Sequence, residues 1–152
     1  MEVVALRDIH AGEEIFNSYL DPMSPSSSTQ RKQDLVGWSF SCKCPICSGD
    51  KVKESDRRRR QITDLQERLE SSRGDAAKIL KHSKELLALM EEEGMIMPKG
   101  DYLELAARGS QVIGRKKEAL QYAVKAKKHW EMLFGLNSKE ARAMDDFMKK
   151  LK

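Results

Sequence analysis

The sequence of 152 residues has few aromatic side chains, few cysteines and no long apolar run. Aromatic residues make up 6% of the chain and the mean hydropathy is −0.63, which is typical of a soluble, helix-rich protein with a modest core. The apolar stretches are a handful of residues long, whereas a membrane-spanning helix needs about 20. We therefore expect no membrane role. The first residues also lack the basic and apolar regions of a secretory signal.

Neither sign of charge is in large excess: the chain has 28 lysines and arginines and 24 acidic residues, and its formal net charge is +4. Basic residues are interleaved with acids, and no nucleic-acid reader motif is visible, so direct nucleic-acid binding is disfavoured. The run from Arg57 to Arg60 has two interpretations: a nuclear localisation signal or anion contact, or a solvated helix start whose charge nearby acids offset.

Cysteine is confined to Cys42, Cys44 and Cys47, an odd number within six residues that cannot form a disulfide framework. A reducing compartment fits, which means the cytoplasm, the nucleus or both. The C-x-C-x-x-C spacing lets three thiolates converge on one tetrahedral Zn²⁺ at Zn–S distances of about 2.3 Å. The fourth ligand is not identified, although His10 is one candidate. The alternative is a set of small buried thiols without metal.

The chain changes character near residue 50. Two short strands are predicted before it, Val3 to Leu6 and Ile15 to Tyr19, with a turn between them. A Ser/Pro-rich loop over 22–29 follows, and Arg31 to Trp38 is predicted to form a short helix that leads into the cysteines.

From about residue 52 the periodicity is helical. Five helices are expected: a first one ending at Gly74, then 75–93 capped by Asp75, 101–113, 116–134, and a last one capped by Asn137 or Ser138. Small and apolar residues fall at the packing positions of a tetratricopeptide-like hairpin, namely Leu103, Ala107, Gly114, Ala119, Ala123 and Ala126. A generic helical hairpin without repeat ancestry is the alternative.

The first fifty residues together resemble the C-terminal end of a SET domain, the catalytic domain of protein-lysine methyltransferases. The matching segments are Val4 to Ile9, Gly12 to Ile15, Ser18 to Asp21, Arg31 to Leu35, and Phe40 to Cys47. The last of these resembles the zinc-binding post-SET motif. With helices following, the whole chain looks most like the SET-MYND branch and its fungal relatives.

This resemblance implies an α+β fold, mostly α, with three parts: the end of a SET domain over 1–40, the post-SET zinc motif over 41–50, and a tetratricopeptide-like helical region over 51–152. It implies S-adenosylmethionine and zinc as cofactors and a protein with an acceptor lysine as substrate, histones included, with a protein partner on the helical region. Tyr19 would be the catalytic tyrosine, Phe40 would pack on the adenine, and Trp38 would line the substrate channel. Without the resemblance, Tyr19 and Phe40 would be an ordinary strand-end tyrosine and a core residue.

The sequence does not contain the Gly-x-Gly cofactor strand or the Asn-His-x-Cys segment that a complete SET domain carries upstream. The latter segment donates the fourth zinc thiolate in the family. We therefore expect this chain to be the C-terminal part of a methyltransferase and to be inactive alone. The competing hypothesis is a non-enzymatic adaptor, in which a zinc knuckle and helical hairpins bind a partner protein.

Overall fold

The computed structural model describes residues 5–15 and 17–151, and all the regular structure within them is helical. In chain order the elements are α1 (Ser28–Asp34), the 3₁₀ helix η1 (Val36–Trp38), α2 (Pro45–Ser48), α3 (Val52–Ser71), α4 (Ala76–Glu93), α5 (Lys99–Val112), α6 (Lys116–Phe134) and α7 (Lys139–Lys150). Within this described part, no helix is both long enough and apolar enough to cross a membrane.

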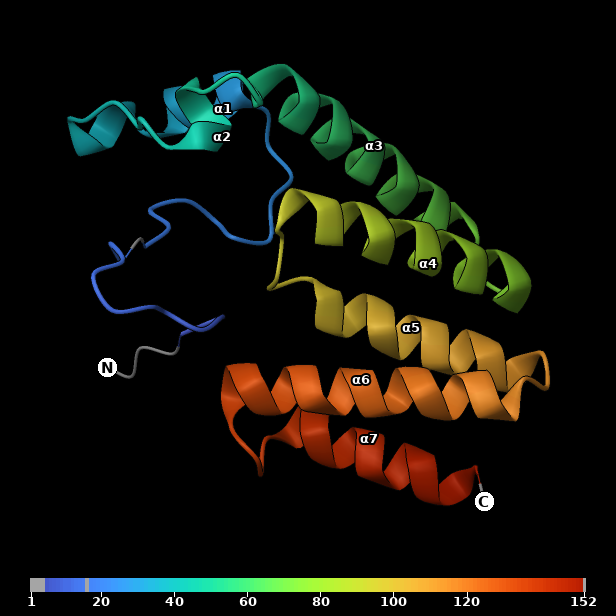
Figure 1. Cartoon of the computed structure of the whole chain (residues 1–152). Coiled ribbons are helices and arrows are strands. Elements are labelled where there is room, and N and C mark those ends of the chain that lie inside the picture. Colours follow the sequence, from blue (N-terminus) through green and yellow to red (C-terminus); the bar gives the residue numbers. More distant parts are fainter. Residues whose placement is uncertain (1–4, 16, 152) are drawn as a thin grey trace.

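The five long helices α3 to α7 lie side by side in chain order (Figure 1). Each helix packs against the next one, and a short connection joins the two. The short elements α1, η1 and α2 gather at the beginning of α3, where α2 contacts both α1 and α3. Residues 5–27, apart from residue 16, form an irregular segment on the same side of the molecule (Figure 1). The cysteine segment is therefore packed at one end of the helical stack.

Side-chain caps and glycines fix several helix ends. The carboxylate of Asp75 accepts the Lys78 N–H at 3.0 Å, which confirms the predicted cap of α4. Gly94 ends the same helix in the left-handed conformation at φ 72°, which a side chain would strain. Of the two candidate caps for the last helix, Ser138 is the one used, because its hydroxyl accepts the Ala141 N–H at 3.3 Å.

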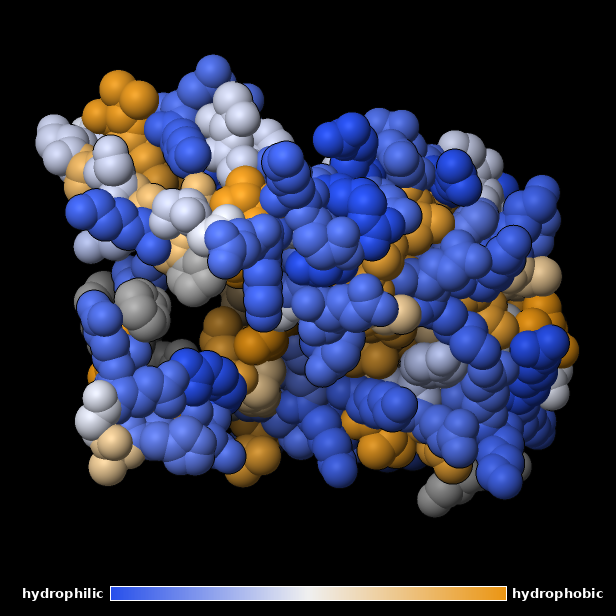
Figure 2. All heavy atoms as spheres, turned by 45° about the horizontal axis from the view of Figure 1, so that its top comes forward, coloured by the Kyte–Doolittle hydropathy of each residue, from blue (hydrophilic) through white to orange (hydrophobic). Residues whose placement is uncertain are grey.

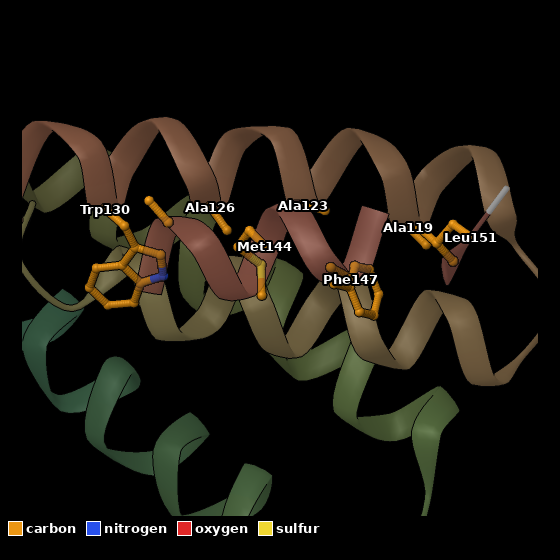
Figure 3. Packing of buried hydrophobic residues seen from close by; sticks show 9 residues of the cluster. Ala119, Ala123, Ala126, Trp130, Met144, Phe147 and Leu151 are labelled. Atoms are coloured by element: carbon orange, nitrogen blue, oxygen red, sulfur yellow. The ribbon is translucent and has the colours of Figure 1, made fainter. Parts of the chain in front are cut away.

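Two clusters of buried side chains hold the helical stack together. One lies between α5, α6 and α7, where small residues of α6 let the neighbouring helices approach closely (Figure 3). The predicted packing residues Ala107, Ala119, Ala123 and Ala126 are all fully buried in it. The second cluster joins α3, α4 and the beginning of α5 around Ile62, Leu86 and Met90. The helical half of the predicted architecture is thus confirmed.

The predicted β-rich segment is wrong for the residues that the structure describes. Val3 and Val4 lie outside them, while Leu6 sits in a bend and Ile15 and Asn17 to Tyr19 form no strand. A strand persists only when a neighbour completes its hydrogen-bond ladder, and residues 5–15 and 17–27 have none within this part of the chain. Ile15 accordingly remains exposed. The described structure is all-α rather than α+β.

The helix predicted over Arg31 to Trp38 is also corrected. It begins earlier, at Ser28, because the Ser27 hydroxyl accepts the Gln30 N–H at 3.2 Å and caps the first turn. It is then divided at Leu35 into α1 and the 3₁₀ helix η1.

Candidate functional site

The three cysteines form one cluster at the beginning of α2. The N–H groups of Cys47 and Ser48 both donate to the Cys44 carbonyl, at 2.9 and 3.0 Å, so the chain folds back on itself within the C-x-x-C segment. This turn brings the Sγ atoms of Cys42, Cys44 and Cys47 within 4.8 Å of one another. Cys47 is buried and the other two thiols are partly buried.

This donor set fits a zinc ion. Zn–S bonds of about 2.3 Å in a tetrahedron place neighbouring sulfurs about 3.8 Å apart, so the three thiols need only a small inward movement. Within residues 5–15 and 17–151, the group consists of the three cysteines alone, and neither His10 nor a carboxylate belongs to it. A closed structural site would therefore take its fourth ligand from outside this group.

Arg31 contacts the cysteine cluster through Cys47. This contact was not predicted from the sequence. Its Nε–H donates to the Cys47 Sγ at 3.5 Å and its Nη2–H donates to the Ile46 carbonyl at 2.9 Å. Its Nη1–H donates to the Ser26 carbonyl. The side chain reaches these partners from α1, so it joins the segment around the beginning of α1 to the cysteine segment.

Tyr19, Trp38 and Phe40, which were predicted from three separate positions, meet in one aromatic cluster. The Tyr19 ring lies 5.3 Å from that of Trp38 and 5.1 Å from that of Phe40, both edge to face. Ser39 adopts the left-handed conformation at φ 56° and turns the chain between its two aromatic neighbours. All three residues are exposed, by 42 to 57% of their surface.

One ring of the aromatic cluster, that of Phe40, lines an open cavity of about 660 Å³ between η1 and the cysteine segment. Leu35, Phe40 and Cys42 are among its lining residues, so the aromatic cluster and the cysteine cluster share one surface. Figure 2 shows exposed hydrophobic groups at the end of the molecule that carries the short helices, whereas the surface over α3 is mainly hydrophilic. This end offers apolar surface to a ligand or to further protein.

The arginine run at the beginning of α3 is largely taken up by ion pairs within the protein. Arg58 and Arg59 donate through Nε to the two carboxylate oxygens of Glu93, at 2.9 and 2.7 Å, and Arg57 pairs with Glu54. The Glu93 side chain is only 1% exposed. This geometry favours the structural interpretation of the run over an anion-binding one.

A further contact holds α1 on α3. The backbone N–H and the hydroxyl of Ser28 donate to the two oxygens of Asp56, at 2.6 and 2.7 Å. Partial burial raises the pKa of Asp56, but the hydrogen bonds from Ser28 outweigh it and hold the pKa below its usual value. The carboxylate is thus well suited to hold the beginning of α1 in place.

Comparison with known proteins reveals partial similarity to lysine methyltransferases. The chain is 43% identical over 60 residues to a histone-lysine N-methyltransferase SET5 of Meyerozyma guilliermondii, covering 39% of this chain and 12% of that protein. It is 38% identical over 65 residues to the N-lysine methyltransferase SMYD2-B of Xenopus laevis, covering 41% and 14%. It is 44% identical over 57 residues to the SET domain and MYND-type zinc finger protein 6 of Schizosaccharomyces pombe, covering 37% and 12%.

The resemblance inferred from the motifs is therefore confirmed as a partial one. The matched region spans only 12 to 14% of the length of these three relatives. No model of a known protein family matches the chain.

Proposed function

We propose that this chain is the C-terminal part of an S-adenosylmethionine-dependent protein-lysine N-methyltransferase of the SET-MYND type. The observation that carries the proposal is the aromatic cluster: Tyr19, Trp38 and Phe40 come from different motifs of the family pattern, yet their rings pack together. Phe40 lines the same cavity as Cys42, one of the three clustered cysteines that the same pattern assigns to zinc. The similarity to SET5 and SMYD2 proteins points to the same activity.

The exposed rings fit one wall of a cofactor site. Phe40 lines the open cavity and presents an aromatic face on which an adenine could stack, so we assign it to hold that base. S-adenosylmethionine, when bound, supplies an electrophilic methyl group on a sulfonium. Its transfer requires a neutral lysine amine in line with the breaking bond, at about 3 to 3.5 Å from the methyl carbon.

Tyr19 would position that amine. Its ring is held edge to face by Trp38 and Phe40, which restricts where its hydroxyl can point. A fixed phenol oxygen can accept a hydrogen bond from the amine and so orient the nitrogen lone pair. Trp38, exposed beside it, would form a wall of the channel through which the lysine side chain enters.

We assign a different role to each of the three parts of the chain. Residues 1–40 would contribute to the catalytic site, 41–50 would bind zinc, and 51–152 would form a tetratricopeptide-like support that also offers a surface to a protein partner. The substrate is a protein lysine, with histones as one candidate class because the SET5 relatives are histone-lysine N-methyltransferases. The location would be the cytoplasm, the nucleus or both.

The 152-residue chain alone is not expected to methylate protein, because its sequence holds neither a Gly-x-Gly cofactor strand nor an Asn-His-x-Cys segment. The test compares calorimetric binding of S-adenosylmethionine by the zinc-loaded chain and by a version extended upstream in its reading frame. Binding by the extended version alone would support the proposal. Binding by neither would favour a non-enzymatic zinc-containing adaptor.

A second test uses the extended protein and changes one hydroxyl. Tyr19→Phe should abolish protein-lysine methylation while helicity and zinc content stay unchanged. Tyr122→Phe is the matched control, because Tyr122 lies on α6 within the helical core and not in the aromatic cluster. Full activity of the Tyr19→Phe variant would contradict the catalytic role and again favour the adaptor.

A further inference from the structure

We propose that Arg31 is a positioning residue for the metal centre: it fixes the Cys47 thiolate from behind and balances the negative charge of the zinc–thiolate group. The inference rests on the proposed zinc site and concerns a residue outside the C-x-C-x-x-C motif. Arg31 is 8% exposed, so its guanidinium is an integral part of this packing and not a surface group. Long charged side chains are rarely buried to this extent unless they are paired.

The donors of Arg31 are arranged around α2 rather than toward solvent. Nε–H points to the Cys47 Sγ at 3.5 Å, and Nη2–H donates to the carbonyl of the preceding residue, Ile46, at 2.9 Å. One guanidinium therefore holds both the backbone and the sulfur of the same turn. The planar fork of arginine suits such a two-point contact, whereas lysine would offer a point charge.

The charge of Arg31 has no carboxylate at ion-pair distance in the part of the chain that the structure describes. Asp56 lies close enough for attraction, but its oxygens are occupied by the donors of Ser28. A Zn²⁺ ion with three thiolates carries a net negative charge, and the contact with Cys47 places the guanidinium beside it. Binding of the metal would thus supply the missing counter-charge for a buried cation.

Arg31 also connects the proposed metal site to α3 through hydrogen bonds. Its Nη1–H donates to the Ser26 carbonyl, and two residues later Ser28 is held on α3 by Asp56. A continuous series of contacts therefore runs from Asp56 on α3 through Ser28 and Arg31 to Cys47. Outer contacts of this kind orient metal ligands, and their removal typically weakens metal binding about 10–100-fold.

The experiment measures Zn²⁺ affinity of the full chain by competition with a chromogenic chelator, with Co²⁺ absorption as a report on the ligand geometry. Arg31→Met should raise the zinc dissociation constant about 10–100-fold and shift the cobalt spectrum. Arg31→Lys keeps the charge but loses the fork, so its affinity should lie between that variant and the unchanged chain. Arg60→Met is the control, since it removes the same charge from an exposed position.

A merely structural role would lower stability in both metal-free and zinc-bound chains and leave the cobalt spectrum unchanged. Unchanged zinc affinity in Arg31→Met would overturn the inference. Should that variant lose its helicity, Arg31→Lys decides: affinity and spectrum equal to those of the unchanged chain would overturn it equally. Failure of the unchanged chain to bind zinc would instead refute the proposed metal site.

Discussion

Replacing Glu93 with glutamine should destabilise the junction of α3 and α4 more than any surface substitution. Glu93 is the last residue of α4, where the helix dipole already places partial negative charge and disfavours an acid. Its carboxylate is nevertheless buried, because Arg58 and Arg59 pair with it and the Ser55 hydroxyl also donates to it. The glutamine side chain has the same size but would remove the carboxylate that pairs with Arg59 and would leave Arg58 with Glu54 alone.

The expected loss follows from the burial of this group. Removing one partner of a buried ion pair costs about 3–5 kcal/mol, because the remaining charge stays desolvated. Arg58 keeps a second partner in Glu54, and both arginine side chains retain 11 to 15% exposure, so the lower end applies, about 3 kcal/mol. In a domain of this size 1 kcal/mol lowers the melting temperature by about 2–4 °C, so we expect a fall of about 6–12 °C.

Urea unfolding followed by circular dichroism measures the free energy, and calorimetry the melting temperature. Glu92→Gln is the matched control, because it makes the same chemical change at the adjacent, exposed residue and should alter stability by less than about 0.5 kcal/mol. Equal losses in the two variants would refute the assignment of the arginine run to an internal ion-pair network. Loss of stability only at high salt would refute it as well.

Three further predictions concern packing, pH and metal. Gly100→Ala should lose about 1–3 kcal/mol in urea unfolding, because the added methyl would overlap the buried ring of Trp130, while Gly37→Ala, next to open space, should be nearly neutral. Burial lowers the pKa of His129 below its usual value of 6.5, so the unfolded chain binds more protons at this residue than the folded chain does. The free energy of unfolding should therefore fall as the pH drops below about 6.5. His129→Gln should make this dependence of stability on pH less steep. Removing zinc with a chelator should reduce amide protection over 28–48 and leave the helicity of α3 to α7 unchanged, as hydrogen exchange and circular dichroism can check.

The long helices could be predicted from sequence because their signals are local. Asp75 and Gly94 bracket α4, and the predicted range 116–134 is that of α6. The beginning of α5 was missed by two residues, since it starts at Lys99, directly after Pro98. Proline is compatible with the first turn of a helix, so its presence in the sequence did not mark the boundary.

The strands could not be predicted correctly because a strand depends on a partner distant in sequence. The apolar patterns near residues 5 and 15 have β character, but the described chain provides no neighbouring ladder, and these residues stay irregular. The beginning of the helix over 28–34, which was predicted to start only at Arg31, was missed for the opposite reason. A Ser/Pro-rich composition indicated a loop, while the Ser27 cap and the contact of Ser28 with Asp56 stabilise a helix there.

The candidate site shows the same division between local and distant information. The cysteine cluster follows from a six-residue spacing, and the structure brings the three thiols together as that spacing implies. Tyr19, Trp38 and Phe40 were found through a family pattern, since no property of their own sequence neighbourhoods marks them as a cluster. The partners of Arg31 in the cysteine segment and those of Glu93 on α3 lie 15 to 38 residues away in the chain, and no local signal identifies such pairs.

The surroundings of the cysteine segment are of two kinds, buried polar contacts and exposed apolar surface. Polar contacts connect it through α1 to α3: Arg31 donates to Cys47, Asp56 accepts from Ser28, and Arg59 donates to the Ser24 carbonyl at 3.4 Å. By contrast, Tyr19, Trp38 and Phe40 are exposed, and the cavity that Phe40 and Cys42 line is open. Hydrogen bonds with fixed directions specify one arrangement, whereas exposed apolar surface can bind what approaches it. If the proposed methyltransferase function holds, the helices would support the aromatic cluster, and a substitution that loosens α3 should lower methylation although it contacts none of the three rings.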